Sequence, residues 1–137
     1  MAVKYWHKEL SNISEKAQIG DGTVIHAGVH IHDEVIIGEN CKVEAGALLF
    51  NGVVLEGNVF IGPGVITTND PKLKGGEFTP VKTLFKKGCK IGAGAIIIAG
   101  HTVGENSIVG AGSVVKCDIP PNEVWTGNPA TFYRMNE

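Results

Sequence analysis

The chain has 137 residues, 19 of them glycine, few aromatic residues and a formal net charge of −2 at pH 7. This length suits a single domain spanning 1–137, and the small net charge without long runs of either sign argues against strong nucleic-acid binding. No apolar stretch reaches the roughly 20 residues that span a bilayer, and the first residues lack a signal-peptide core, so we expect a cytoplasmic protein without a membrane partner.

A six-residue repeat starts at Ile13, runs to residue 66, and resumes from 85 to about 120. In these fifteen hexads the first residue is Ile, Val or Leu, except for Phe85. The fourth residue is Gly in nine hexads and Asn in three, and both accept a positive φ at low cost. The fifth residue is nearly always small or β-branched. Each hexad therefore predicts a short strand with its first side chain inward, followed by a tight corner.

One short strand cannot bury its apolar side alone, so successive turns of the chain must stack. Three hexads per turn predict an all-β, three-sided parallel β-helix of about five coils, with the aliphatic residues filling its interior. Such an interior has no room for a substrate. A site must therefore lie outside, at a corner, in a loop or against another subunit. The flat faces of the helix also favour a closed homotrimer.

Three histidines of the early coils, His26, His30 and His32, have the spacing H-x3-H-x-H. The repeat predicts that His26 stacks under Glu44 and His30 under Leu48, about two turns below the loop. His30 is a candidate for substrate binding, and solvated surface histidines are the alternative interpretation for this group, which includes His32.

The repeat is interrupted between 67 and 84 by "TTNDPKLKGGEFTPVKTL", which lacks the aliphatic column. Eighteen residues make one full turn, so we expect a loop that leaves one corner and returns in frame at Phe85. Long loops on rigid scaffolds are often functional. Asn69 and Asp70 at the start of the loop are candidates for substrate binding, and an ordinary Asx turn leading into Pro71 is the alternative.

In the second block of hexads, His101 occupies a fifth position, where most hexads have a small residue. With an 18-residue loop removed, it stacks one turn above Val65, beside the corner that the loop leaves. A residue that breaks a local rule at such a place is a candidate catalytic residue. A hydrogen-bonded corner histidine is the alternative. Residues 121–137 then form a short C-terminal tail.

The three cysteines show no CxxC spacing, and an odd number does not predict a disulfide framework. Cys41 and Cys89 fall on inward positions of the repeat, so we expect buried thiols. Cys117 falls at a turn and is expected to be exposed.

The hexads, the junction "VFIGPGVITTND" and the segment "KKGCKIGAGAIIIAGHTVGENSIVGAGSVVKCDIPPNEVWTGNPA" together resemble the left-handed β-helix acyltransferases. Within that family the sequence is most similar to N-acetyltransferases that modify amino sugars carried on UDP or dTDP. The resemblance covers about residues 11–131. It implies that acetyl-CoA is the co-substrate and lies in the groove between neighbouring subunits of a homotrimer, with its thioester directed at the corner where the loop leaves.

The resemblance also implies a set of CoA-binding residues in the late coils and the tail. By position these are Ala93, Ala99, Ala111, Lys116, Pro121, Asn128 and Arg134. The chain departs from the family in two places. The lysine before the Pro pair is moved by one position to Lys116, and Thr131 follows "GNPA" where the family often has an arginine, so that Arg134 is the nearest one.

Acyl transfer to a hydroxyl needs a general base, most often His, whereas a neutral amine is already nucleophilic. Related sugar O-acetyltransferases carry a His in or near the start of the loop, and 67–84 contains none. Amino-sugar relatives often have Asn pairs near Glu44, which leaves this carboxylate as a second catalytic candidate, with a solvated side chain as the alternative. Asn51, on the next hexad, is a candidate for substrate binding.

The sequence thus predicts an acetyl-CoA-dependent N-acetyltransferase acting on the amino group of a nucleotide-linked amino sugar. One alternative is O-acetylation of a sugar or oligosaccharide, with His101 or an early-coil histidine as base. Another is a catalytically silent β-helix that serves in binding or assembly. We expect no metal, because γ-class carbonic anhydrases of this fold take their zinc-binding histidines from separate coils and subunits, with a different spacing.

Overall fold

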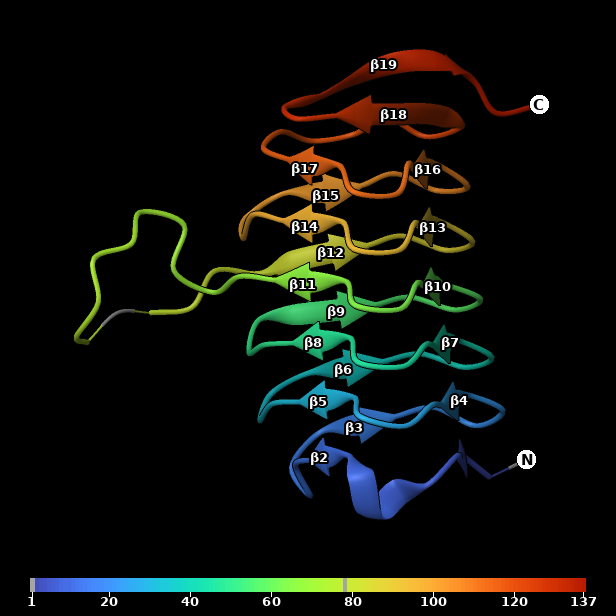
Figure 1. Cartoon of the computed structure of the whole chain (residues 1–137), viewed down its shortest axis with the longest axis vertical. Coiled ribbons are helices and arrows are strands. Elements are labelled where there is room, and N and C mark those ends of the chain that lie inside the picture. The colour runs from blue at the N-terminus through green and yellow to red at the C-terminus, as the bar shows by residue number, and fades with distance from the viewer. Residues whose placement is uncertain (1, 78) are drawn as a thin grey trace.

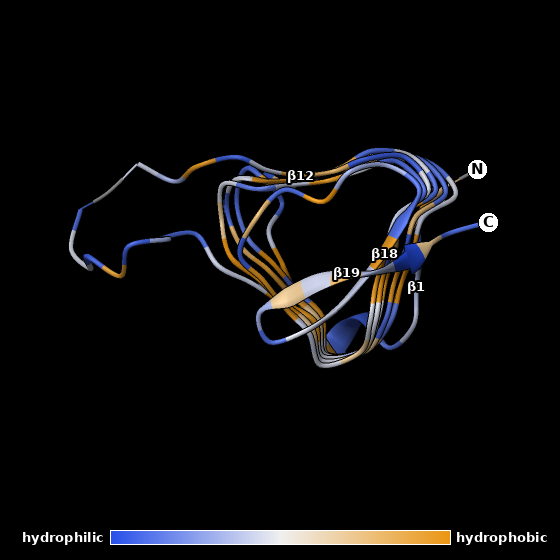
Figure 2. Cartoon of the chain, turned by 90° about the horizontal axis from the view of Figure 1, so that it is seen from above, coloured by the Kyte–Doolittle hydropathy of each residue, from blue (hydrophilic) through white to orange (hydrophobic). Residues whose placement is uncertain are grey.

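The computed structural model describes residues 2–77 and 79–137, and it is a parallel β-helix of short strands arranged in three sheets (Figure 1). Viewed along its axis the helix has a three-sided outline, and a long loop projects from one corner (Figure 2). A short 3-10 helix, η1 (Lys8–Leu10), joins the first two strands. Among the described residues, no helix has the length and apolar character needed to cross a membrane.

The strands of each sheet come from successive coils. Sheet A contains β1 (Lys4–Tyr5), β4 (Val24–Ile25), β7 (Lys42–Val43), β10 (Phe60–Ile61), β13 (Lys90–Ile91), β16 (Ile108–Val109), β18 (Glu123–Gly127) and β19 (Ala130–Met135). Sheet B contains β2 (Asn12–Ile13), β5 (His30–Ile31), β8 (Leu48–Leu49), β11 (Ile66–Thr67), β14 (Ile96–Ile97) and β17 (Val114–Val115). Sheet C contains β3 (Gln18–Ile19), β6 (Ile36–Ile37), β9 (Val53–Leu55), β12 (Thr83–Phe85) and β15 (Thr102–Val103).

Three columns of corners join these sheets, and we name each by the sheets that it joins. The AB corner comprises 26–29, 44–47, 62–65, 92–95 and 110–113. The BC corner comprises 14–17, 32–35, 50–52, the loop 68–82, and 98–101. The CA corner comprises 20–23, 38–41, 56–59, 86–89 and 104–107.

The predicted roles of the hexad positions are confirmed. From Ile25 to Val115 the first-position side chains are at most 2% exposed and form one continuous core, against which the partly buried Ile13 and Ile19 pack. At the fourth positions, every glycine and each of Asn40, Asn58 and Asn106 has a positive φ. These residues let the chain turn at each corner without the steric penalty that a β-branched residue would meet there.

The number of coils and the form of the tail differ from the sequence-based expectation. Sheet A stacks seven parallel strands instead of about five, because β1 precedes the hexads and β18 follows them. The C-terminal tail is a hairpin in which β19 pairs antiparallel with β18. These end strands lack the hexad pattern because their surroundings differ from those of an interior coil: β1 pairs only with β4, and β18 pairs on one side with the antiparallel β19. The hairpin covers the last coil, where Ala130 is buried.

The inserted loop is shorter than predicted. Paired residues in neighbouring coils are 18 positions apart in most of the helix, as in Ile36 and Val54, but 30 apart across the loop, as in Phe60 and Lys90. The insertion therefore adds 12 residues. The remaining six residues of 67–84 form an ordinary hexad. Its inward residues, Thr67 and Thr83, are polar, so the hexad does not show the aliphatic pattern of the others.

The cysteines lie where the repeat predicts. Cys41 and Cys89 are buried, Cys117 is exposed, and all three are free. Burial raises the pKa of the Cys89 thiol to about 12, so its reactive thiolate is absent at neutral pH. We expect a maleimide to label Cys117 alone in the native protein and all three cysteines after denaturation, as counted by intact-mass spectrometry. Native labelling of Cys89 would contradict the structure.

Candidate functional site

Both ends of the loop are fixed to the coils by threonine hydroxyls. Thr67, which is buried, donates from Oγ1 to the carbonyl of Leu48 (3.2 Å) and accepts from the amide of Phe50 (3.0 Å). Thr68 Oγ1 accepts from the amide of Ala99 (2.9 Å), and Thr83 Oγ1 accepts from the amide of Gly100 (3.0 Å). These bonds satisfy backbone groups that the departing chain would otherwise leave unpaired. The loop thus starts and ends on rigid supports.

A hollow of about 700 Å³ lies between this loop and the BC corner, and we call it the loop pocket. Its lining residues are His32, Asn51, Asn69, Gly76, Glu77, Thr79 and Pro80. The Nδ2 group of Asn69 donates to Oδ1 of Asn51 over 2.6 Å, so the two amides form a ladder across adjacent coils. Two of the predicted substrate-binding residues, Asn51 and Asn69, therefore meet in one pocket.

Asp70 lies in the loop but outside the loop pocket, where it shapes the backbone. Its Oδ2 accepts from the amide of Gly75 over 2.8 Å. That bond is the main reason why the pKa of the Asp70 carboxyl lies below its usual value of 3.8. The bond between Asp70 and Gly75 is therefore fully formed at pH values above 3.8, and it is lost only as the pH falls through the lower pKa that Asp70 has in the folded protein. Asp70 lines a smaller hollow of about 270 Å³ within the loop.

His32 is a residue of the loop pocket that the sequence interpretation did not assign to it. Its Nδ1 atom is buried and has no hydrogen-bond partner among the described residues. The ring packs against Phe50 (6.1 Å between centroids) and His30 (5.9 Å). The repeat could have predicted this position, because residues 32, 50 and 68 occupy the same point of successive coils and residue 68 is at the start of the loop. His30 itself lies on sheet B, beside the loop pocket.

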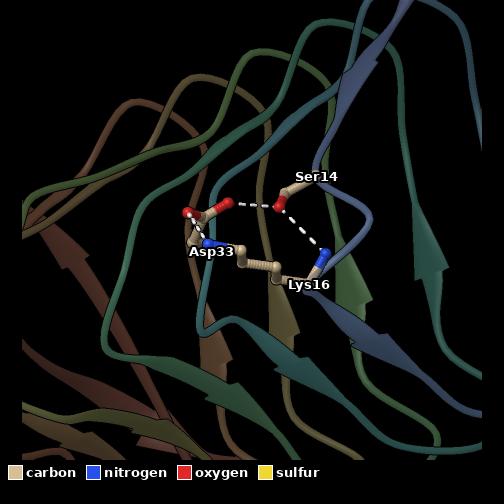
Figure 3. Close-up of polar contacts among 3 residues, drawn as sticks. All are labelled: Ser14, Lys16 and Asp33. Carbon is tan, nitrogen blue, oxygen red and sulfur yellow. Dashed lines mark hydrogen bonds and ion pairs between the residues drawn. The ribbon is translucent and has the colours of Figure 1, made fainter.

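Next to His32, three residues of the BC corner form a polar cluster: Asp33 of the same coil, and Ser14 and Lys16 of the coil below (Figure 3). The hydroxyl of Ser14 donates to the carboxylate of Asp33 and accepts from the backbone amide of Lys16, and the Nζ of Lys16 lies 4.0 Å from Asp33 Oδ2. The Ser14 bond is the first reason why the pKa of Asp33 is lowered. The cluster therefore favours the ionised form of Asp33, and its carboxylate is already bonded to Ser14 and close to Lys16.

His101 lies in the BC corner one coil above the loop and does not line the loop pocket. Because Leu84 pairs with Thr102, His101 stacks above Thr83 and not above Val65 as predicted. This expectation is wrong because the insertion is 12 residues long and not 18. The Nδ1 of His101 lies 3.4 Å from Oδ1 of Asp118, which also accepts from the Thr102 amide.

Glu44, the other catalytic candidate, lies on a different edge of the helix. It occupies the AB corner, where its Oε2 is 2.9 Å from Nε2 of His26. The predicted stacking of His26 under Glu44 and of His30 under Leu48 is confirmed. His30 and His32 lie together, but His26 is on the AB corner and His32 on the BC corner, so the three early histidines do not meet at one point. The described residues contain no group of three or more His, Cys, Asp or Glu placed to hold a metal ion.

The predicted CoA-binding residues also divide between corners. Ala93 and Ala111 lie in the AB corner, and their backbone amides have no acceptor among the described residues. Asn128 lies above them, since the adjacent Gly127 amide donates to Ser113 Oγ (3.1 Å). The Ala99 amide, in the BC corner, is already bonded to Thr68.

The other three predicted CoA-binding residues lie apart from the AB corner. Lys116 is exposed in the turn after β17 that leads to Ile119, which bridges to Val103 of sheet C, so it continues the BC corner one coil above 98–101. Pro121 lines a hollow of about 580 Å³ on the outer side of sheet C. Arg134 is exposed on the hairpin and donates to the carbonyl of Met135.

Two family descriptions match parts of the chain. Residues 16–51 match "Bacterial transferase hexapeptide (six repeats)", and residues 87–117 match "Hexapeptide repeat of succinyl-transferase". The chain is a hexapeptide-repeat protein. No curated protein matches it.

Solved structures with the same fold include acetyltransferases and an N-acyltransferase. The acetyltransferase domain of PglB from Neisseria gonorrhoeae, in complex with acetyl coenzyme A, is 26% identical with a TM-score of 0.83, and the match covers 96% of this chain and 58% of that chain. PerB from Caulobacter crescentus, in complex with CoA and GDP-perosamine, is 25% identical with a TM-score of 0.83, covering 97% and 58%. This chain therefore spans only about three fifths of each of those two chains.

A third relative resembles the chain in fold alone. AntD, an N-acyltransferase from Bacillus cereus solved with dTDP and 3-hydroxybutyryl-CoA, is 19% identical with a TM-score of 0.79, and the match covers 99% of this chain and 78% of that chain.

Proposed function

We propose that the chain is an acetyl-CoA-dependent N-acetyltransferase that acts on the amino group of a UDP- or dTDP-linked amino sugar. The observation that carries this proposal is the loop pocket, a hollow on the outside of a rigid, filled helix that has room for a small molecule. Its Asn51 and Asn69 amides both donate and accept hydrogen bonds, which suits the hydroxyl groups of a sugar. PglB with acetyl coenzyme A and PerB with GDP-perosamine support the donor and the acceptor class.

The donor would lie along the AB corner. The free amides of Ala93 and Ala111 are spaced one coil apart and suit the carbonyl groups of the pantetheine arm. Asn128 would then contact the part of CoA nearest the hairpin. Since three free cysteines suit a reducing compartment, we place the reaction in the cytoplasm.

A homotrimer would bring donor and acceptor together. In one chain the loop pocket and the free amides lie on corners separated by sheet B. If three copies surround an axis with their sheets B facing it, the BC corner of each copy lies against the AB corner of the next. The outward residues of sheet B support this arrangement because four successive levels are aliphatic: Leu48, Ile66, Ile96 and Val114. Burial of that column would contribute the association energy.

In this arrangement the neutral amine of the sugar attacks the thioester carbonyl carbon while both substrates are held in position. Positioning of this kind can contribute a large share of the rate for a reactive nucleophile. O-acetylation is the second candidate, because the unpartnered Nδ1 of His32 in the loop pocket could accept a proton from a hydroxyl.

The proposal is tested by measuring release of CoA thiol with acetyl-CoA and matched acceptors. We expect turnover with a dTDP- or UDP-linked amino sugar and none with the corresponding hydroxyl sugar. Asn69→Ala should raise the acceptor KM by about tenfold through loss of hydrogen bonds, while Lys42→Ala on sheet A should change nothing. Turnover of the hydroxyl sugar alone would favour O-acetylation, and absence of turnover with every acceptor would leave a binding or assembly module.

A further inference from the structure

His26 and Glu44 form an imidazole–carboxylate pair outside the loop pocket. The Nε2 of His26 lies 2.9 Å from Oε2 of Glu44, and the two side chains are 31% and 26% exposed. They come from adjacent coils, because Val24 pairs with Lys42. A carboxylate that accepts from Nε2 keeps the proton on that nitrogen and leaves Nδ1 with a free lone pair.

The imidazole is also held from the side. The ring of Trp6 stacks on His26 with centroids 6.2 Å apart and planes inclined by 14°, and Nζ of Lys4 lies 4.5 Å from the Trp6 ring. Nδ1 of His26 makes no hydrogen bond to any described residue. The ring is therefore fixed in orientation while one nitrogen remains available to a ligand, which is the arrangement that proton transfer requires.

The pair lies on the path proposed above for acetyl-CoA. Going down the AB corner, the coil of Ala111 is followed by those of Ala93, Pro63 and Glu44. The amide of Gly112 donates to the carbonyl of Ala93, and the amide of Gly94 donates to the carbonyl of Pro63, which fixes this order. Glu44 thus lies two coil spacings, about 10 Å, below Ala93. It also lies in the same coil as Asn51 of the loop pocket, since β8 joins them.

We propose, on the basis of the proposed function, that His26 is the proton acceptor for acyl transfer to a sugar held in the loop pocket of the neighbouring copy. The amine nitrogen forms a bond to the thioester carbon as the carbon–sulfur bond breaks. One amine proton passes to Nδ1 of His26 and then to the departing thiolate, which leaves as neutral CoA. Glu44 and Trp6 are positioning residues that fix the tautomer and the ring.

Turnover by the parent chain tests the proposed function. The role of His26 is tested separately, by the activity of each variant relative to that of the parent. We expect His26→Ala to lower kcat by about a hundredfold with little change in the acceptor KM. His7→Asn is the matched control, because His7 also faces a glutamate (3.4 Å from Glu9) but both side chains are largely exposed. A His26→Ala variant within threefold of the parent would overturn the proton-transfer role.

Mixed trimers test whether the residue acts on the neighbouring copy. His26→Ala chains retain the loop pocket, whereas chains lacking 70–81 retain His26, so each kind alone has no complete site. A trimer that contains both kinds of chain has one junction in which an intact loop pocket faces an intact His26. When equal amounts of the two chains mix at random, about a quarter of all junctions are of this kind, so about a quarter of the parent activity should return. If native mass spectrometry confirms mixed trimers and activity stays at the level of the separate variants, the assignment to the neighbouring copy is wrong.

Discussion

A chain that lacks residues 70–81 should fold like the parent and lose at least about a hundredfold in acetyl transfer. This deletion removes the 12 inserted residues and restores the spacing of 18 between neighbouring coils. Lys82→Gly is included because the new corner then has a residue that accepts a positive φ. The loss is expected because the deletion removes four residues that line the loop pocket: Gly76, Glu77, Thr79 and Pro80.

Thermal unfolding and the size of the assembly are the controls for this variant. Both should stay near those of the parent, since Thr67, Thr68 and Thr83 and their bonds to the coils are retained. Replacement of Leu73, an exposed loop residue that does not line the loop pocket, by Ala should leave activity unchanged. Full activity in the deletion variant would show that the acceptor binds elsewhere.

Phe85→Ala should lower the free energy of unfolding by about 3–5 kcal/mol. Phe85 is the largest fully buried side chain, it is 0% exposed, and it lies in β12 directly after the loop. Its removal leaves a cavity that the stacked coils cannot close, because their spacing is set by the hydrogen bonds of the sheets. Denaturant unfolding followed by circular dichroism measures the change.

The comparison variant for this experiment is Leu73→Ala, which removes a side chain that is 86% exposed and should change stability by less than about 0.5 kcal/mol. Equal stability of Phe85→Ala and the parent would mean that the core beside the loop is loosely packed.

The sequence by itself determined the coil. Ile31 and Leu49 are inward because the first position of each hexad must be, and Asn40 turns a corner because it accepts a positive φ. Counting in units of three hexads also placed His26 under Glu44 and kept Cys41 and Cys89 inside. These features follow from local periodicity, since each coil repeats the geometry of the one beneath it.

The tertiary structure decided what the repeat could not encode. Thr67 and Thr83 occupy inward positions as polar residues, so aliphatic counting overestimated the loop and misplaced His101. The hairpin of β18 and β19 covers the last coil without any hexad pattern. The loop pocket forms only when the loop folds back on Asn51 and His32. A contact between an irregular loop and a regular coil depends on the path of the loop in space, and no periodic signal records that path.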